Sequence, residues 1–330
     1  MTTAPAPDWS DPLWRDGALA WIAEALGRHG RRVTGPVEPR VRPWSLVWRV
    51  PTGAGDVWFK ANNPGTRHEA ALLAELARLA PGRVLDPIAL DVRRGWSLLP
   101  DGGPSLRDTL AGQQDLSHWE RLLPRYAALQ LAVAPHTRAL LDAGVPDHRP
   151  QRLPALYAEL LDDDAALLRG TPDGLTAESY ERLRAYRDEF AALCRRLAEY
   201  GVPASVQHDD LHDGNVFVAG DGYRFFDWGD ASLAHPFGTL LVTLRSVAYA
   251  SGLGPDDPAL LRLRDAYLEA WTDRHDRPSL REAAGVAMRV TVVSRSLSWR
   301  RALDTPDPSR AEYAEAVPGW LGELFEPLPV

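Results

Sequence analysis

Apolar positions in the first hundred residues occur in short runs that turn residues separate. A helical spacing begins at Asp11-Pro12 and continues through Leu26, with Gly30 as its expected end, since proline suits a first helical turn. Five strand-like runs follow, at 37–41, 45–50, 56–61, 84–92 and 96–99. The third and fourth runs are separated by a helical pattern over 66–79, which Pro81-Gly82 ends. This half is therefore predicted to be a sheet with one inserted helix.

The pattern changes after the breaker cluster Asp101-Gly-Gly-Pro104, and the remaining chain is mostly helical in its periodicity. Thr176 is expected to cap a helix that reaches Tyr200. One interruption, at 215–218 and 223–226, is typical of a hairpin with its turn at Gly220-Asp-Gly222.

These patterns predict an α+β protein with two lobes. Residues 1–100 would form a small antiparallel sheet lobe with one key helix, and residues 101–330 a larger, mostly helical lobe. A hydrophobic content of 45% and a charged content of 25% fit an ordinary globular chain. The cleft between the lobes, spanned by residues 98–104, is the expected ligand site.

Charge and cysteine content narrow the class of protein. The net charge of -8 argues against a nucleic-acid partner, which needs a basic surface. The N-terminus lacks the basic start and apolar run of a signal peptide, and no stretch is apolar enough to cross a membrane. Cys194 is the only cysteine, so no internal disulfide can form. A cytoplasmic protein, monomeric or homodimeric, is expected.

The densest polar motif is His208-Asp-Asp-Leu-His-Asp-Gly-Asn215, with Asp227 just beyond the predicted hairpin. Phosphoryl transfer needs a carboxylate near the attacking hydroxyl and oxygen ligands for magnesium on the nucleotide phosphates. Asp210 and Asn215, five positions apart, can supply both from one loop, and Asp227 is placed to complete the metal site. The motif therefore predicts a magnesium-dependent phosphotransferase.

The spacing His208-x-Asp210-Leu-His-x-x-Asn215 resembles the catalytic loop of aminoglycoside phosphotransferases and related small-molecule kinases, which share the protein-kinase-like fold. Asp227-Trp-Gly is similar to the kinase Asp-Phe-Gly. This resemblance implies that Asp210 is the catalytic base, that Asn215 and Asp227 bind magnesium, and that His208 supports the loop. Asp209 stands where many relatives carry glycine.

The kinase interpretation requires a strand lysine and a helix glutamate upstream. Lys60, at the end of Val57-Trp-Phe-Lys, is the only lysine in the chain and is expected to hold the nucleotide phosphates. Glu69 shares a helix face with Leu72 and Leu76, whereas Glu75 projects away from that face. A carboxylate facing the core needs a partner, so Glu69 is the predicted partner of Lys60.

The segment 96–107 resembles the family's hinge, which implies that adenine hydrogen-bonds to backbone at Leu98, Leu99 and Pro100. No glycine-rich loop precedes Lys60. Its counterpart is expected to be the turn 42–45, with Ser45 as a candidate phosphate contact. ATP is the expected nucleotide, with GTP as an open alternative, and Mg²⁺ the expected metal.

The acceptor is expected beside the catalytic loop. Candidate substrate-binding residues are Asp209, His212, Asp213, Asp230, Arg295 and Trp299. Acidic side chains favour cationic acceptors, although the run 162–164 is also typical of a solvated helix end. Relatives modify different alcohols, so an aminoglycoside-like antibiotic, an amino sugar or a related polar alcohol is the expected class.

The sequence therefore predicts an ATP-dependent O-phosphotransferase. Two alternatives stay open. One is a catalytically idle kinase-like module that only binds nucleotide, although the lysine, base and metal positions are all present. The other is a metal-dependent hydrolase with His208, Asp210 and His212 as ligands, which leaves Asn215 and the N-terminal half unexplained.

Overall fold

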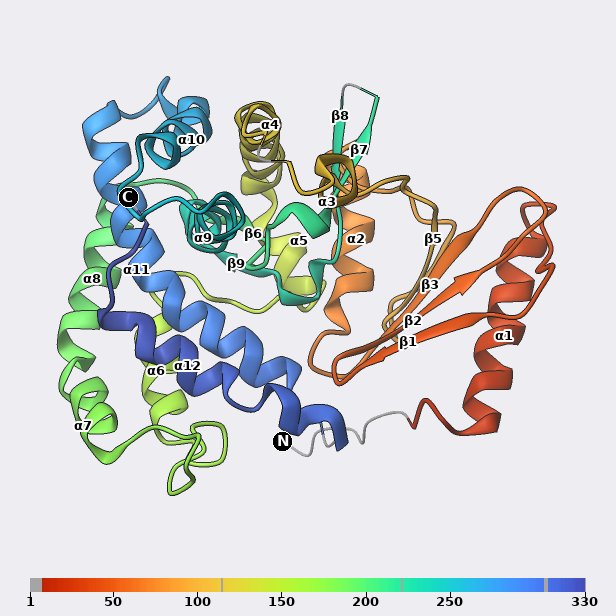
Figure 1. Cartoon of the computed structure of the whole chain (residues 1–330), viewed down its shortest axis with the longest axis horizontal. Helices are drawn as coiled ribbons and strands as arrows, with labels where there is room; N and C mark the ends of the chain where they lie inside the picture. The colour runs from red at the N-terminus through yellow and green to blue at the C-terminus, as the bar shows by residue number, and fades with distance from the viewer. Residues whose placement is uncertain (1–7, 114, 221, 306–307, 330) are drawn as a thin grey trace.

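The computed structural model describes residues 8–113, 115–220, 222–305 and 308–329, and it has a sheet part and a helical part (Figure 1). The sheet part contains α1 (Pro12–Gly27), β1 (Glu38–Arg42), β2 (Ser45–Val50), β3 (Val57–Asn62), α2 (His68–Leu79), β4 (Ala89–Asp91) and β5 (Trp96–Pro100). The strands are antiparallel in the order β1-β2-β3-β5-β4. The predicted fold class is confirmed, although the run 84–92 forms a strand only at β4.

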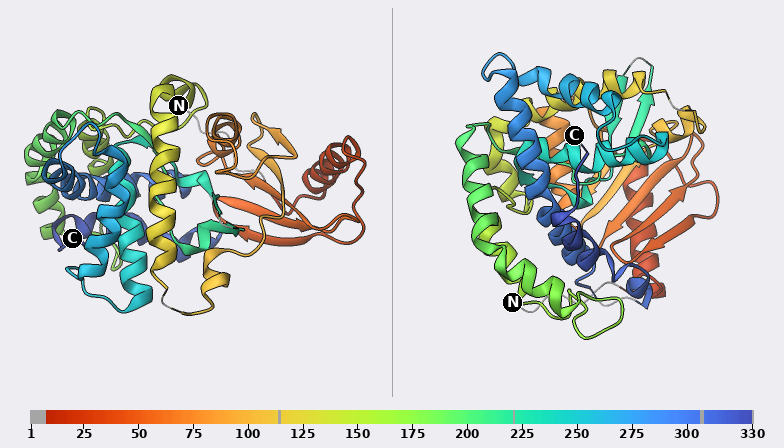
Figure 2. Two further views of the ribbon diagram at one scale, coloured as in Figure 1. Left: turned by 90° about the horizontal axis from the view of Figure 1, so that it is seen from above. Right: turned by 60° about the vertical axis from the view of Figure 1, so that its left-hand side comes forward.

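Alternation along β3 determines which side chains face the cleft. Val57, Phe59 and Ala61 are buried in a cluster with α1, which covers the outer face of the sheet (Figure 2, left). Because neighbouring strand residues point to opposite faces, Lys60 lies on the inner face, toward the helical part. The apolar pattern of β3 therefore places the lysine in the cleft.

The helical part begins after β5. Its helices are α3 (Leu106–Leu110), α4 (Ser117–Val133), α5 (Thr137–Asp142), α6 (Leu153–Leu161), α7 (Ala177–Ala185), α8 (Arg187–Glu199), α9 (Leu240–Ser251), α10 (Pro258–Leu268), α11 (Arg277–Ala302) and α12 (Ala316–Gly322). The strand pairs are β6 (Ser205–Gln207) with β9 (Ser232–Ala234), and β7 (Val216–Ala219) with β8 (Gly222–Phe225). No helix among the described residues is long and apolar enough to span a membrane.

Two predictions for this part are confirmed in outline. The Thr176 side chain accepts a hydrogen bond from the Ser179 amide at 3.1 Å and caps α7. The helix ends near Tyr186 and restarts as α8, so the predicted single helix is two. The hairpin forms as β7 and β8, whereas the pair β6 and β9 that flanks the catalytic loop was not predicted.

Helix α2 connects the two parts through its packing. Leu72, Leu73 and Leu76 belong to the large core of the helical part rather than to the core under α1. At the other end of the cleft, the Asn63 side-chain amide donates to the carbonyl of Ala302, the last residue of α11, at 2.9 Å. Helix α2 and the end of α11 therefore both join the sheet part to the helical part.

Candidate active site

The catalytic loop follows β6 and is anchored through buried hydrogen bonds. The His208 amide donates to the Tyr126 hydroxyl at 3.0 Å, and its Nε2 lies 2.9 Å from the Phe226 carbonyl oxygen. Thr243 donates to the Leu211 carbonyl at 2.9 Å. His208 is fully buried, and burial lowers its pKa, so it supports the loop as a neutral side chain.

Asp209 faces the interior rather than the cleft. Its backbone adopts a left-handed conformation, with φ of 62°, and its side chain is buried. The carboxylate accepts hydrogen bonds from Ser232 at 2.7 Å and from Gln207. Burial raises the pKa of Asp209 to about 6. This placement argues against the predicted substrate contact of Asp209.

Asp210 points the other way, into the cleft, and donors surround its carboxylate. Asn215 Nδ2 donates to the Asp210 carbonyl at 2.9 Å and to its Oδ2 at 3.3 Å. Arg295 Nη2 donates to Oδ1 at 2.9 Å. Although burial opposes the charge, Arg295 holds the pKa of Asp210 well below its usual range. Asp210 is therefore ionised and fixed in orientation.

The predicted metal ligands are brought together by the β7–β8 hairpin. Val216 pairs with Phe225, and the Phe226 amide donates to the Asn215 carbonyl at 3.1 Å, so Asp227 follows directly beside Asn215. Asp227 has a φ of 64°, a strained conformation that is concentrated at functional sites. Asn215 Nδ2 faces Asp210, which turns the amide oxygen the other way. An amide oxygen and a carboxylate are donors that fit Mg²⁺.

Lys60 lies between two carboxylates. Its Nζ is 2.6 Å from Glu69 Oε2 and 2.5 Å from Asp227 Oδ1. Although burial opposes its charge, Asp227 and Glu69 hold the pKa of Lys60 above its usual range. Glu69 Oε1 also accepts the Trp228 amide at 2.9 Å. Glu75 instead pairs with Arg78 on the helix surface, so the structure brings the predicted glutamate to the lysine.

The predicted hinge residues lie at the end of β5. Leu98 is buried and its carbonyl accepts from the Ile88 amide at 2.8 Å, whereas Leu99 and Pro100 are partly exposed. Two residues further on, Gly102 is so close to the Phe217 ring that an added Cβ would lie 2.3 Å from it. Phe217 stacks on Phe226 with ring centroids 4.0 Å apart. The chain that connects the two parts therefore packs at Gly102 against the stacked rings of Phe217 and Phe226.

One small cavity, of about 90 Å³, brings together Lys60 of the sheet part with Asp210 and Asp227 of the helical part, whereas Glu69 and Asn215 do not line it. It is lined by Trp44, Lys60, Asn62, Thr66, Asp210, Asp227, Gly229, Asp230, Arg295, Trp299 and Ala302. Ser45 is absent from this lining and is buried at the start of β2, opposite Asn62. The predicted turn 42–45 thus presents Trp44 to the cavity instead.

Two of the candidate substrate residues, His212 and Asp213, brace the loop. The Gly214 amide donates to His212 Nδ1 at 2.9 Å, and Nε2 of the same ring lies 3.5 Å from Asp210 Oδ2. Asp213 accepts from Arg107 of α3 at 2.7 Å. Arg107 was not predicted as a site residue, because nothing in its spacing links it to a loop more than a hundred positions away.

An aromatic cluster closes the cavity on the side of α11. The Trp44 ring meets Trp299 edge to face at 5.5 Å and Tyr313 at 4.9 Å. Trp299 and Tyr313 are stacked at 6.1 Å. Trp299, predicted as a sugar-binding wall or a core residue, is half-buried and lines the cavity. The turn before β2 therefore contacts the end of α11 directly.

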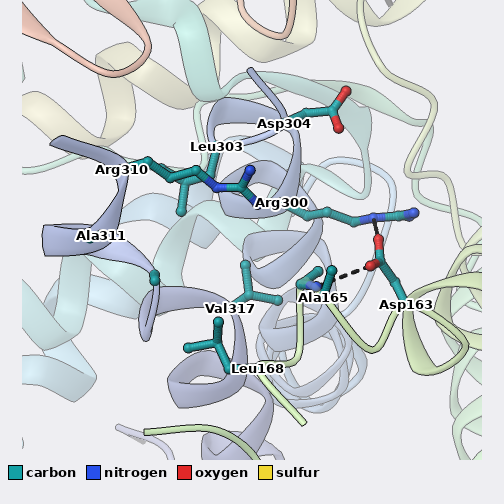
Figure 3. A pocket seen from close by; sticks show the side chains of 11 residues that line it. Asp163, Ala165, Leu168, Arg300, Leu303, Asp304, Arg310, Ala311 and Val317 are labelled. Atoms are coloured by element: carbon teal, nitrogen blue, oxygen red, sulfur yellow. Dashed lines mark hydrogen bonds and ion pairs between the residues drawn. The ribbon is translucent and has the colours of Figure 1, made fainter. Parts of the chain in front are cut away.

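The acidic run 162–164 is neutralised by arginines. Arg187, Arg300 and Arg169 pair with its three carboxylates in turn, at 3.4, 2.7 and 2.9 Å. Figure 3 shows the pair of Asp163 and Arg300 beside a cavity of about 520 Å³. This cavity is lined by none of the predicted site residues. The run therefore gives little support to a cationic acceptor.

The geometry argues against the hydrolase alternative. His208 is turned to the Phe226 carbonyl, and His212 has its Nδ1 occupied by the Gly214 amide. Within the described ranges, no three histidine, cysteine, aspartate or glutamate side chains are grouped so that they could hold a metal ion.

A two-part kinase-like fold, a lysine–glutamate pair and a loop carboxylate facing that pair define a phosphotransferase of the kinase-like class. Residues 44–238 match the phosphotransferase enzyme family, and the chain belongs to that family. The predicted family and the prediction of a phosphotransferase enzyme are thereby confirmed. No curated protein matches the chain.

Solved structures share the fold at low sequence identity. Macrolide 2'-phosphotransferase MphH from Brachybacterium faecium is 17% identical with a TM-score of 0.55, over 91% of this chain and 98% of that one. Choline kinase from Cryptosporidium parvum is 10% identical with a TM-score of 0.64, over 94% of both chains. The amicoumacin kinase hAmiN, in complex with AMP-PNP and Ca²⁺, is 12% identical with a TM-score of 0.57, over 94% and 93%.

Proposed function

We propose that this enzyme transfers the terminal phosphoryl group of ATP to a hydroxyl group of a small polar molecule, with Asp210 orienting that hydroxyl. The observation that carries the proposal is the cavity that Lys60, Asp227 and Asp210 line together. Phosphoryl transfer is catalysed mainly by positioning and charge, and the Lys60 ammonium group and the carboxylates of Asp227 and Asp210 line one small space here.

In this proposal each residue has a limited task. Lys60 binds the nucleotide phosphates, and Glu69 holds Lys60 in the cleft. Asn215 and Asp227 hold Mg²⁺, which when bound neutralises phosphate charge. Asp210 accepts a hydrogen bond from the acceptor hydroxyl and aligns it with the phosphate. Because Arg295 keeps Asp210 ionised, its main task is orientation, and its affinity for the proton is low.

The nucleotide side of the proposal places adenine against the chain between residues 98 and 104. Leu99 and Pro100 are partly exposed there, and the Leu98 carbonyl already has a backbone partner. This segment also divides the proposed nucleotide lobe, residues 1–100, from the proposed acceptor lobe, residues 101–330. ATP is proposed over GTP as the commoner donor, and amicoumacin kinase was solved with an ATP analogue and a divalent cation.

The acceptor class can be found with purified full-length protein. The protein is incubated with ATP and Mg²⁺ and a panel of macrolides, aminoglycosides, amino sugars and choline-like alcohols, and phosphorylated products are detected by mass. We expect at least one hydroxyl-bearing compound to gain one phosphate group. ATP binding without transfer to any acceptor would instead favour the idle nucleotide-binding module.

Asp210→Asn tests the role of the loop carboxylate. We expect transfer to fall by about 1,000-fold while nucleotide affinity is unchanged, since removing one preorganised polar group from an active site costs about 10²–10³-fold. Asp142→Asn is the control, because Asp142 is an exposed carboxylate paired with Arg138 outside the site. Unchanged turnover in Asp210→Asn would contradict the assignment.

A further inference from the structure

Arg295 is a buried arginine in the C-terminal third of α11, on the wall of the cavity. Its side chain is 5% exposed, and its two terminal nitrogens contact different carboxylates. Nη2 lies 2.9 Å from Asp210 Oδ1, and Nη1 lies 2.5 Å from Asp230 Oδ2. A buried arginine whose fork is divided between two acids has very little freedom to turn toward a ligand.

The guanidinium group of Arg295 also packs against two tryptophan rings. Its central carbon lies 5.3 Å from the centre of the Trp299 ring and 5.8 Å from that of Trp320. Asp230, the third residue after Asp227, keeps the second arm of the fork engaged. The Asp230 carboxylate and the two indole rings therefore orient the guanidinium group independently of its contact with Asp210.

The contacts on Asp210 divide between its two oxygens. Arg295 donates to Oδ1, while Asn215 Nδ2 at 3.3 Å and His212 Nε2 at 3.5 Å lie on Oδ2. The last two donors belong to the catalytic loop itself, so they move with Asp210. Arg295 is the donor that ties the carboxylate to a helix outside the loop.

We propose that Arg295 is a positioning residue, which fixes the plane of the Asp210 carboxylate so that one oxygen edge faces the acceptor hydroxyl. This inference rests on the proposed function for the task of Asp210, whereas the orientation of the carboxylate can be measured without any acceptor. It replaces the predicted role of Arg295 as a direct substrate contact, since both arms of the fork are already engaged.

The first experiment measures orientation. Crystal structures of the full-length protein and of Arg295→Ala are determined with Mg²⁺ and a non-hydrolysable ATP analogue. We expect one Asp210 rotamer in the unmodified protein and a rotated or divided side chain in the variant, with the Lys60–Glu69 pair unchanged. An identical single rotamer of Asp210 in both structures would overturn the proposal.

The second experiment measures transfer and its chemical rescue. In Arg295→Ala, kcat should fall about 100-fold with the KM for ATP unchanged, because misplacing a catalytic group by about 1 Å costs a factor of this size. Guanidinium chloride, at a concentration that leaves the protein folded, should restore kcat about tenfold, and sodium chloride should not. A merely structural role would lower the melting temperature without any rescue.

Two further variants separate the possible outcomes. Arg295→Lys keeps the charge without the fork and should still lose about tenfold in kcat, which also provides a test if the alanine variant does not fold. Arg281→Ala removes an arginine of the same helix that pairs with Asp265 at 2.6 Å away from the site, and kcat should be unchanged. If the unmodified protein transfers phosphate to no acceptor, the proposed function fails, and the two crystal structures still decide the role of Arg295.

Discussion

The two halves of the site follow one plan with different cations. On the side proposed to bind the nucleotide, Lys60 lies between Glu69 and Asp227, and on the side proposed to bind the acceptor, Arg295 lies between Asp210 and Asp230. Lysine is a compact charge on a flexible stem, and it can exchange one carboxylate for a phosphate. Arginine is a planar fork that fixes the geometry of both its partners.

This difference fits the demands of the two halves. A nucleotide must enter and leave, so its cation has to accept different partners during each cycle. The acceptor hydroxyl needs a carboxylate that keeps one orientation, so the cation behind that carboxylate should not move. The plan therefore predicts that the partners of Lys60 have unequal roles, with Glu69 permanent and Asp227 shared with the metal.

The largest expected effect comes from changing Asp227, the partner of Lys60 that is expected to be shared with the metal. Asp227→Asn removes the carboxylate that is proposed to bind the metal and leaves Lys60 with Glu69 alone. We expect kcat/KM for ATP to fall by about 1,000-fold, the size of effect seen when a preorganised charge is removed from an active site. Steady-state kinetics over a range of Mg²⁺ concentrations measures this loss. An unchanged Mg²⁺ dependence would show that Asp227 binds no metal.

The next largest effect on catalysis is expected from changing Glu69, the permanent partner of Lys60. Glu69→Gln should lower kcat/KM about 100-fold, because Lys60 and the Trp228 amide lose the carboxylate that positions them. Glu75→Gln on the same helix is the matched control, and its rate should stay within about twofold, since exposed ion pairs contribute little. Equal losses in the two variants would point to a general defect of α2 rather than to the lysine pair.

A third effect concerns Asp209, the buried carboxylate beside Asp210. Its pKa of about 6 lies above the value of 3.8 expected in the unfolded chain, so between these values the folded state holds a proton that the unfolded state releases. Stability should therefore fall as the pH rises from about 4 to 6, by on the order of 2–3 kcal/mol.

Asp209→Asn removes this titration. The difference between the unfolding free energies of the two proteins, measured with urea at a series of pH values, isolates Asp209 because the other carboxylates cancel. A difference that stays constant between pH 4 and 7 would show that Asp209 does not titrate in this range.

The smallest expected effect, on stability, tests the aromatic contact between the sheet part and the helical part. Trp44 of the sheet part meets Trp299 and Tyr313 of the helical part. Trp44→Ala should lower the free energy of unfolding by about 1–2 kcal/mol, since each aromatic pair contributes about 0.5–1.5 kcal/mol. Trp44→Phe should retain most of that energy. Thermal denaturation followed by calorimetry distinguishes the two, and equal melting temperatures in both variants would contradict the contribution of these ring contacts.

The nucleotide half could be predicted from the sequence because its signals are local. A lone lysine in an apolar strand, and a glutamate in phase with Leu72 and Leu76, are both visible in short windows. The hairpin register then brings Asn215 next to Asp227. Alternation and helical period were enough to choose Glu69 over Glu75.

The acceptor half could not be predicted in the same way. The partner of Asp210 is an arginine 85 positions later, and the chain has many arginines with similar neighbours. Asp209 and Asp210 are adjacent in the sequence, yet a left-handed backbone at Asp209 turns their side chains to opposite sides. Trp44 lines the cavity and its neighbour Ser45 does not, a difference between adjacent positions that the sequence pattern does not reveal.

The contact between Gly102 and Phe217 has a consequence for the evolution of the family. A side chain at position 102 would collide with the ring at position 217, so a change of the glycine alone is disfavoured. Relatives with a small residue in place of the phenylalanine should be free to carry a side chain in place of the glycine. The two positions should therefore vary together, since contacting residues are expected to covary.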